Sequence, residues 1–344
     1  MKPAAAASES IAEEAALRIL TASGAAGDAL VAGFLAASAA RPGALFGPLQ
    51  ILIAGPGVGS RAFDGRPRQP GLGSPRPRGF IKGQPIPEAA RVATPASLGA
   101  LALLHAHAGV LPFERLADAG VEHARAIGAK ERADALANVG RLGASALSEP
   151  RLARPILAVS DRAEGGLLSE RDLADVRPDM AAPRDVPLAA NRRVLLVPWA
   201  LPETAHRIAE TLAVVDARGV LGVLAYCPDD EGLRVPELGL SLPRDAVLVR
   251  RGIPRMSPGE PLPCPCAVAL GVLDERPFLA MGARSSTNLS AAGLLPAWGE
   301  PVASAFALLA AARVAAQSAY AVAVVRSHES DEAAKLVSSE RTGS

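Results

Sequence analysis

The chain has 344 residues, of which 49 % are hydrophobic and 21 % are charged, so it can bury a large core and is not globally disordered. A net charge of +1 and an aromatic content of 3 % argue against the basic surface and the stacking platform of a nucleic-acid-binding protein. Three cysteines do not suit a disulfide-stapled secreted scaffold, and acidic residues interrupt the N-terminus before an apolar signal segment forms. We therefore expect a cytoplasmic protein without a nucleic-acid partner.

The first half of the chain is mostly helical by pattern. Ser10 followed by Glu13 has the capping-box spacing and starts a predicted helix that ends near Gly24. Two short runs of strand-forming residues flank a glycine-rich turn at 55–59, and residues 69–82 are predicted to be an exposed, mobile loop rich in Pro, Gly and Arg. The other predicted elements are helices at 28–40, 97–107, 113–127 and 131–137 and strands at 49–54, 60–63 and 194–197.

The second half changes in character. Residues 203–212 begin as a predicted helix, and short strand-like runs then alternate with turns such as those at 216–219 and 274–277. Residues 301–325 carry an arginine at their centre, which is costly in a bilayer, so we expect a buried helix there and no membrane span. The charged tail at 327–344 is expected to fray. The predicted strands are 213–215, 220–226, 246–250, 267–273 and 278–281.

Three patterns suggest a cofactor or a metal, but none has the context that such a site needs. The glycines at 55–59 lack the third glycine and the following helix of a dinucleotide fingerprint. His105 and His107 are two residues apart on a predicted helix and so point to different faces. Cys264 and Cys266 have one residue between them, and the chain has no second cysteine pair. We predict no metal and no organic cofactor, and we expect the cysteines to be small buried side chains.

Helices, then two groups of antiparallel strands, then helices again predict a layered α+β protein. Several blocks, in the correct order over residues 7 to about 290, resemble the gamma-glutamyltranspeptidase family. The opening block through residues 25–32 is similar to the family's G-N-A-V-D-A-A-V-A, and residues 63–66 look like its L-D-G-R. Residues 92–100 resemble V-A-V-P-G-T-V-A-G, and residues 109–116 resemble G-x-L-P-W-x-x-L. The most specific block, residues 165–178, is close to G-G-x-L-T-x-x-D-L-A-x-Y.

This resemblance implies an N-terminal-nucleophile hydrolase with a four-layer αββα sandwich in a single chain. Residues 1–208 would match the family's large subunit, residues 209–326 its small subunit in the same sandwich, and residues 327–344 a flexible tail. The segment before the nucleophile strand is shorter than in the family and lacks the maturation linker. We therefore expect the chain to stay uncleaved.

The resemblance is weakest where the chemistry belongs. In the family, autoproteolysis frees a threonine whose hydroxyl is the nucleophile and whose own amine is the base. When residues 214–216 are aligned on the family's V-V-D, the position of that threonine is Ala209, which has no hydroxyl. The nearest substitute is Thr211, two residues on and therefore about 6–7 Å along the strand.

Other family positions have changed as well. The paired serines that hold the glutamyl carboxylate in the family correspond to Cys264 and the proline before it, and the paired glycines of the oxyanion site correspond to Ser285 and Ser286. Arg66 is the one recognisable binding residue that is kept. Its other interpretation, packing a loop or pairing with a nearby aspartate at position 64 or 28, is about equally good.

Two classes of function remain open. The first is a gamma-glutamyltransferase-like protein with a degraded site, acting as a binding or accessory protein. The second is an active acyl or gamma-glutamyl transferase or amidohydrolase with a site rebuilt around Thr211, Cys264 or the serines at 285–286. The combined loss of nucleophile, carboxylate clamp and paired glycines favours the first, and a specialised enzyme that uses only the old pocket stays open.

The expected partners follow from the same resemblance. They are a small amino-acid-like or gamma-glutamyl ligand held by Arg66, and a protein partner or a second copy of the chain, with no membrane. We also expect Ala209, Cys264, Ser285 and Arg66 to converge around one cavity. The strand at 211–215 should then have the strands at 266–273 and 278–282 as its neighbours.

Overall fold

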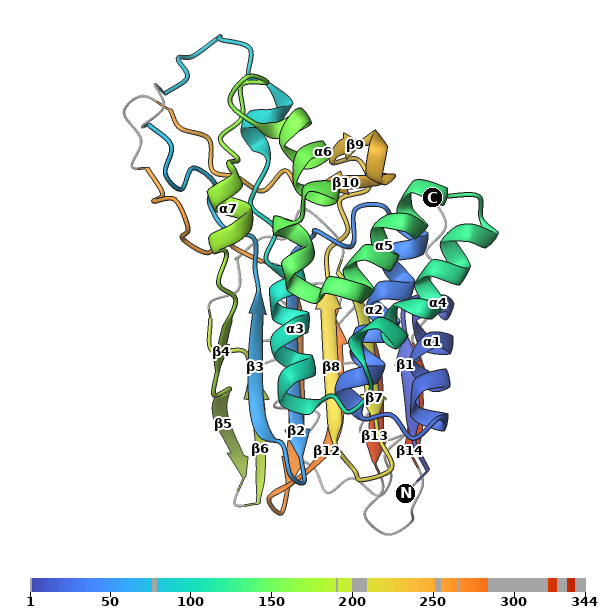
Figure 1. Cartoon of the computed structure of the whole chain (residues 1–344). Helices are drawn as coiled ribbons and strands as arrows, with labels where there is room; N and C mark the ends of the chain where they lie inside the picture. The colour runs from blue at the N-terminus through green and yellow to red at the C-terminus, as the bar shows by residue number, and fades with distance from the viewer. Residues whose placement is uncertain are drawn as a thin grey trace, which may run out of the picture.

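The computed structural model describes residues 2–75, 79–189, 191–199, 209–250, 255–264, 266–283, 321–326 and 333–337. Two six-stranded antiparallel sheets stack face to face, and helices cover the outer face of the first sheet (Figure 1). Sheet 1 contains, in spatial order, β1 (Ala4–Ala7), β7 (Glu210–Val215), β8 (Leu221–Tyr226), β2 (Leu49–Gly55), β3 (Gly59–Gly65) and β4 (Asp179–Ala181). Sheet 2 contains β14 (Ala333–Val337), β13 (Ala321–Arg326), β12 (Arg276–Ala283), β11 (Ala267–Leu273), β6 (Arg192–Leu196) and β5 (Arg184–Ala189).

Strands from both sides of residue 208 share each sheet. Because side chains alternate along a strand, β7 serves two cores at once. Leu212 and Val214 pack under the helices, whereas Ala213 and Val215 face sheet 2. All six residues of β7 are buried as a result. The division of the chain at residue 208 itself stays a prediction.

The helical layer is built around α2 (Ala26–Ala40), which is buried from Ala26 to Ala39. Small residues let neighbouring elements approach it closely: a Cβ at Gly33 would lie 2.4 Å from Leu212 and 2.8 Å from the carbonyl of Ala12. The buried Asp28 carboxylate fixes the start of α2 by accepting from the Ala25 N–H at 3.0 Å. The other helices of the layer are α1 (Ser10–Thr21), α3 (Ser97–Ala108), α4 (Phe113–Ala126) and α5 (Lys130–Leu142).

Short elements lie beyond the upper ends of the strands in Figure 1. Asp172 holds the start of the predicted mobile loop, accepting from Leu72 N at 2.9 Å and from Gly71 N at 3.0 Å. Residues 69–71 are consequently buried, which corrects the prediction of an exposed loop for that part. The short elements beyond the strand ends are α6 (Pro150–Ser160), α7 (Glu170–Asp175), β9 (Leu233–Val235), β10 (Leu240–Leu242) and the 3-10 turns η1 (Glu88–Arg91), η2 (Gly143–Ser148) and η3 (Pro236–Leu238).

Several local predictions are wrong. The N-cap of α1 is Glu9, and Glu13 accepts from the N–H of Ala7 at 3.3 Å in place of forming a capping box. Residues 210–212 are strand, and 246–250 form only an isolated bridge at Arg250. The predicted helix at 301–325 lies outside the described residues up to residue 320, and from there β13 replaces it. Likewise β14 lies within the segment expected to fray.

The predicted neighbours of β7 also need correction. Within sheet 1 its neighbours are β1 and β8, whereas β12 lies across from it in sheet 2. Thr211 touches β12 closely, since a Cβ at Gly282 would lie 2.6 Å from Thr211 Oγ1. None of the described helices is both long and apolar enough to cross a membrane.

Candidate functional site

The candidate site lies where β7 begins and β8 ends, at one end of the space between the sheets. The strand register places Thr211 opposite Ala225, Ala225 opposite Gln50, and Gln50 opposite Asp64. Paired residues of antiparallel strands share a face of the sheet. Ala225 faces sheet 2, so the whole row does.

A group of small buried side chains fills this space, and we call it the inter-sheet cluster. Ala209 and Cys264 both belong to it and are almost completely buried. Trp199 packs against the cluster, and the guanidinium of Arg66 lies 5.3 Å from the centre of the Trp199 ring. The structure thus brings Ala209, Cys264 and Arg66 to one region, whereas Ser285 and Ser286 lie outside the described residues. The described cluster is Ala6, Leu52, Ala54, Ala62, Leu195, Val197, Ala209, Ala213, Val215, Leu221, Val223, Ala225, Cys227, Cys264, Cys266, Val268, Leu270, Val272 and Ala280.

Thr211 is held as an ordinary strand residue. Its N–H donates to Ser8 Oγ at 2.8 Å, and its carbonyl accepts from the N–H of Ser8 at 2.9 Å. An N-terminal nucleophile uses its own free amine as the base, but this nitrogen is a hydrogen-bonded peptide amide. Thr211 would therefore have such a base only after cleavage of the chain directly before it.

Arg66 is bound to an aspartate, as one of its two interpretations predicted. Its Nε and Nη2 donate to the two oxygens of Asp64 at 2.8 and 3.0 Å, and Arg68 donates to the same carboxylate at 3.0 Å. The Asp64 side chain is 1 % exposed, so the trio is shielded from solvent. Two guanidiniums and one carboxylate give the trio itself a net charge of +1, and Asp179 of β4 lies opposite Asp64 in the strand register.

Two polar side chains at the site lack partners and were missed in the sequence. Both amide atoms of the fully buried Gln50 and the indole Nε1 of Trp199 have no hydrogen-bond partner among the described residues. A buried polar group without a partner is costly, so these atoms set this end of the inter-sheet space apart from an ordinary apolar core. The sequence does contain a sign of the first of them, because Gln50 is a polar residue inside an otherwise apolar strand around Ile51.

The helix-facing side of the same strand ends carries a charged network. Tyr226 donates its hydroxyl to Glu9 at 2.6 Å, and Arg41 contacts Glu9 at 3.1 Å, Glu210 at 3.7 Å and Asp230 at 2.5 Å. Burial raises the pKa of Glu9 above 4.5, outweighing the lowering effects of Tyr226 and Arg41. Burial also raises the pKa of Tyr226 well above its ordinary value.

The raised pKa of Glu9 gives a testable pH dependence. Glu9 contributes fully to stability below pH 4.5, and that contribution is lost as the pH rises through its raised folded pKa. Glutamine cannot ionise, so Glu9→Gln should not lose stability in this way as the pH rises. We therefore expect the free energy of unfolding of Glu9→Gln, relative to that of wild type, to be higher at neutral pH than at pH 4.5. Urea unfolding at both pH values measures it. Glu122→Gln, which removes an exposed carboxylate paired with Arg18, is the control, and an equal improvement there would contradict the assignment.

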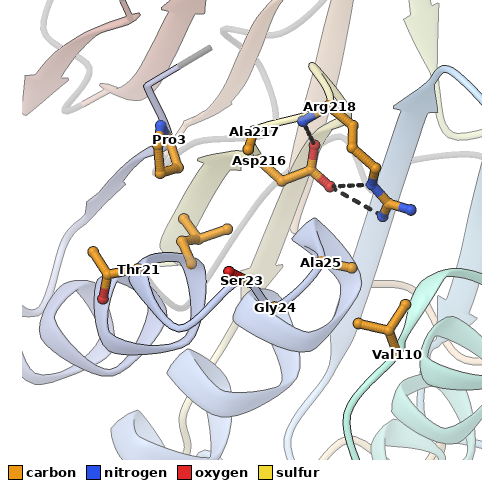
Figure 2. A pocket seen from close by; sticks show the side chains of 10 residues that line it. Pro3, Thr21, Ser23, Gly24, Ala25, Val110, Asp216, Ala217 and Arg218 are labelled. Atoms are coloured by element: carbon orange, nitrogen blue, oxygen red, sulfur yellow. Dashed lines mark hydrogen bonds and ion pairs between the residues drawn. The ribbon is translucent and has the colours of Figure 1, made fainter.

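A separate pocket lies at the opposite end of β7, where Asp216 follows the strand (Figure 2). Its volume is about 590 Å³, and Arg218 pairs with Asp216 at its wall. Asp216 also accepts from the backbone of Ala26 and Val220, so the carboxylate mainly ties the end of β7 to the start of α2. Among the described residues, no group of three His, Cys, Asp or Glu side chains is arranged to hold a metal ion.

Two solved structures share this fold, and the predicted mixed helix-and-sheet class is confirmed. The predicted helix at 301–320, which would supply the second outer helical layer of an αββα sandwich, lies outside the described residues. A cephalosporin acylase from Bacillus halodurans is similar with a TM-score of 0.75 and 14 % identity, over 97 % of this chain and 94 % of that one. A gamma-glutamyltranspeptidase from Pseudomonas nitroreducens complexed with L-DON is similar with a TM-score of 0.50 and 20 % identity, over 57 % of this chain and 70 % of that one. No family model matches the sequence, and no curated protein matches it.

Proposed function

We propose that this protein is a gamma-glutamyltransferase-like binding protein that has lost nucleophilic catalysis. The observation that carries the proposal is Ala209, an alanine 1 % exposed in the inter-sheet cluster, at the position that aligns with the family's nucleophile. A methyl group can neither attack an acyl carbon nor drive the acyl shift that cleaves the chain.

The rebuilt-site alternative has less support. Thr211 would need a free amine, which requires cleavage directly before it, and it lies two residues beyond the position that aligns with the family's nucleophile. Cys264 has no exposed surface and lies in an apolar cluster, which shields its thiol from a substrate. The serines at 285–286 stay candidates only by their alignment with the family.

We propose a small carboxylate-bearing ligand, amino-acid-like or gamma-glutamyl in character. The excess positive charge of the Asp64 trio would attract the carboxylate, and Nη1 of Arg66 has no described partner. The amide of Gln50 and the indole N–H of Trp199 would supply further hydrogen bonds. The proposal also includes a role beside a protein partner or as a homo-oligomer. Light scattering of the purified protein measures its mass in solution and so tests the homo-oligomer.

The test of lost catalysis combines mass spectrometry with turnover of a chromogenic gamma-glutamyl anilide. We expect one uncleaved chain and no release of the aniline above the buffer rate, because Ala209 has no hydroxyl to attack the substrate or to drive cleavage of the chain. Thr211→Val and Cys264→Ser should behave like wild type. Turnover that disappears in one of these variants, or a new N-terminus at Thr211, would restore the enzyme.

Binding is tested separately by calorimetry with a gamma-glutamyl dipeptide. We expect saturable binding that Arg66→Met weakens at least tenfold, since a charge-assisted hydrogen bond contributes about 1.5–3 kcal/mol. Arg193→Met, at an ion pair remote from the trio, is the matched control and should bind like wild type. Absence of binding by the folded wild type, or equal binding by Arg66→Met, would contradict this ligand.

A further inference from the structure

All three cysteines of the chain meet between the two sheets. Cys227 directly follows β8 of sheet 1, whereas Cys266 directly precedes β11 of sheet 2. Cys264 lies two residues before Cys266 in the same cluster. All three are free thiols with no exposed surface. Their convergence joins positions that are far apart in the sequence and lie on opposite sheets.

The thiol of Cys266 interacts with both of the others, and its contact with Cys227 joins the two sheets. The Sγ atoms of Cys227 and Cys266 are 3.5 Å apart. The carbonyl of Pro48 holds both residues, accepting from the N–H of Cys227 at 3.0 Å and from the thiol of Cys266 at 3.5 Å. A disulfide bond is about 2.05 Å long, so the sulfurs need to approach by about 1.5 Å.

We propose that Cys227 and Cys266 form a reversible disulfide that links sheet 1 to sheet 2 beside the candidate site, with a peroxide as the oxidant. The thiolate of Cys266 attacks one peroxide oxygen, giving a sulfenic acid while the other oxygen leaves as water after protonation. The thiolate of Cys227 then attacks the sulfenic sulfur, and the hydroxyl leaves as a second water. Two thiols and one hydrogen peroxide thus give one disulfide and two waters.

Burial sets the rate of this chemistry. Burial and the neighbouring thiols raise the pKa of Cys266 well above its ordinary value, so little thiolate exists at neutral pH. The reaction is therefore slow at neutral pH and faster in alkaline solution. Bulky thiol reagents are excluded by the cluster, whereas a peroxide is small.

The disulfide would close a loop from residue 227 to residue 266. That loop carries β9 and β10 and returns to the site at Cys264. Closing it restricts the unfolded chain and ties the two sheets together at the site. The oxidised protein is therefore expected to melt several degrees higher than the reduced protein.

The experiment treats the reduced full-length protein with hydrogen peroxide under native conditions, followed by alkylation in denaturant, intact mass spectrometry and peptide mapping. We expect a loss of about 2 Da, one alkylated thiol in place of three, and a single linked peptide pair joining Cys227 to Cys266. Dithiothreitol should restore all three thiols.

Cys264→Ser is the matched control, because it should still form the linked pair and leave no free thiol. Cys227→Ser and Cys266→Ser should abolish the loss of mass. The proposal is overturned if three thiols remain after oxidation, if Cys264 joins Cys266, or if only singly oxidised sulfurs accumulate. If a serine variant does not fold, the peptide map of the oxidised wild-type protein still shows whether Cys227 is linked to Cys266.

Discussion

Replacing Asp64 with alanine is expected to lower the free energy of unfolding by about 3–5 kcal/mol. The Asp64 carboxylate is 1 % exposed and accepts from Arg66 and Arg68, whose side chains are 14 % and 9 % exposed. Its removal leaves two guanidiniums in a poorly solvated space without a counter-charge. Urea unfolding followed by circular dichroism measures the loss.

Asp185→Ala is the matched control for this variant. Asp185 also pairs with an arginine, Arg193, at 2.9 Å, but its side chain is 44 % exposed. An exposed pair contributes about 0–1 kcal/mol, so the control should unfold nearly like wild type. Equal losses for Asp64→Ala and Asp185→Ala would show that burial of the trio has no energetic consequence.

Replacing Gly43 with alanine is expected to cost about 2–4 kcal/mol, or to prevent folding. An added Cβ would lie 2.1 Å from the carbonyl carbon and 2.2 Å from the carbonyl oxygen of Asp229, and 2.5 Å from Asp230 N. These are backbone atoms, so no side-chain rotation relieves the clash. The shift would also break the bonds from Gly43 N to Asp230 at 3.0 Å and from Asp229 N to Gly43 O at 3.3 Å.

Gly57→Ala is the control for Gly43→Ala, because it introduces backbone strain without a steric clash. Gly57 has a φ of +81°, but a Cβ there would meet nothing within 4 Å. Only the left-handed conformation opposes alanine at Gly57, which costs about 1 kcal/mol. A smaller loss for Gly43→Ala than for Gly57→Ala, measured by thermal unfolding, would contradict the close approach.

Strong local signals could be interpreted correctly from the sequence. Small apolar residues over 28–40 predicted a buried helix, and α2 is buried because elements approach it from several sides. The glycine turn at 55–59 predicted the hairpin of β2 and β3, since glycine readily adopts the positive φ found at Gly55, Gly57 and Gly59. Alignment on residues 214–216 placed Ala209 at the opening of a strand, and the structure has it directly before β7.

Weak local signals were overridden by packing. Four alanines form β1, although alanine is the best helix former, because β7 offers a free edge for antiparallel pairing. Residues 321–325 are rich in alanine and valine and were predicted to be helical, but they pair with β12. The hydrogen bonds of a sheet come from distant segments, so no local pattern reveals them.

The sequence by itself determined that position 209 carries no hydroxyl, because an alanine has none in any fold. It also predicted the mixed helix-and-sheet class, which the structure confirms. Only the tertiary structure decided how the remaining groups are used. It paired Arg66 and Arg68 with one aspartate, left the amide of Gln50 without a partner among the described residues, and brought Cys227 against Cys266. Residue identity fixes what a side chain can do, but burial and distance fix what it does, and both arise from contacts between segments that are far apart in the sequence.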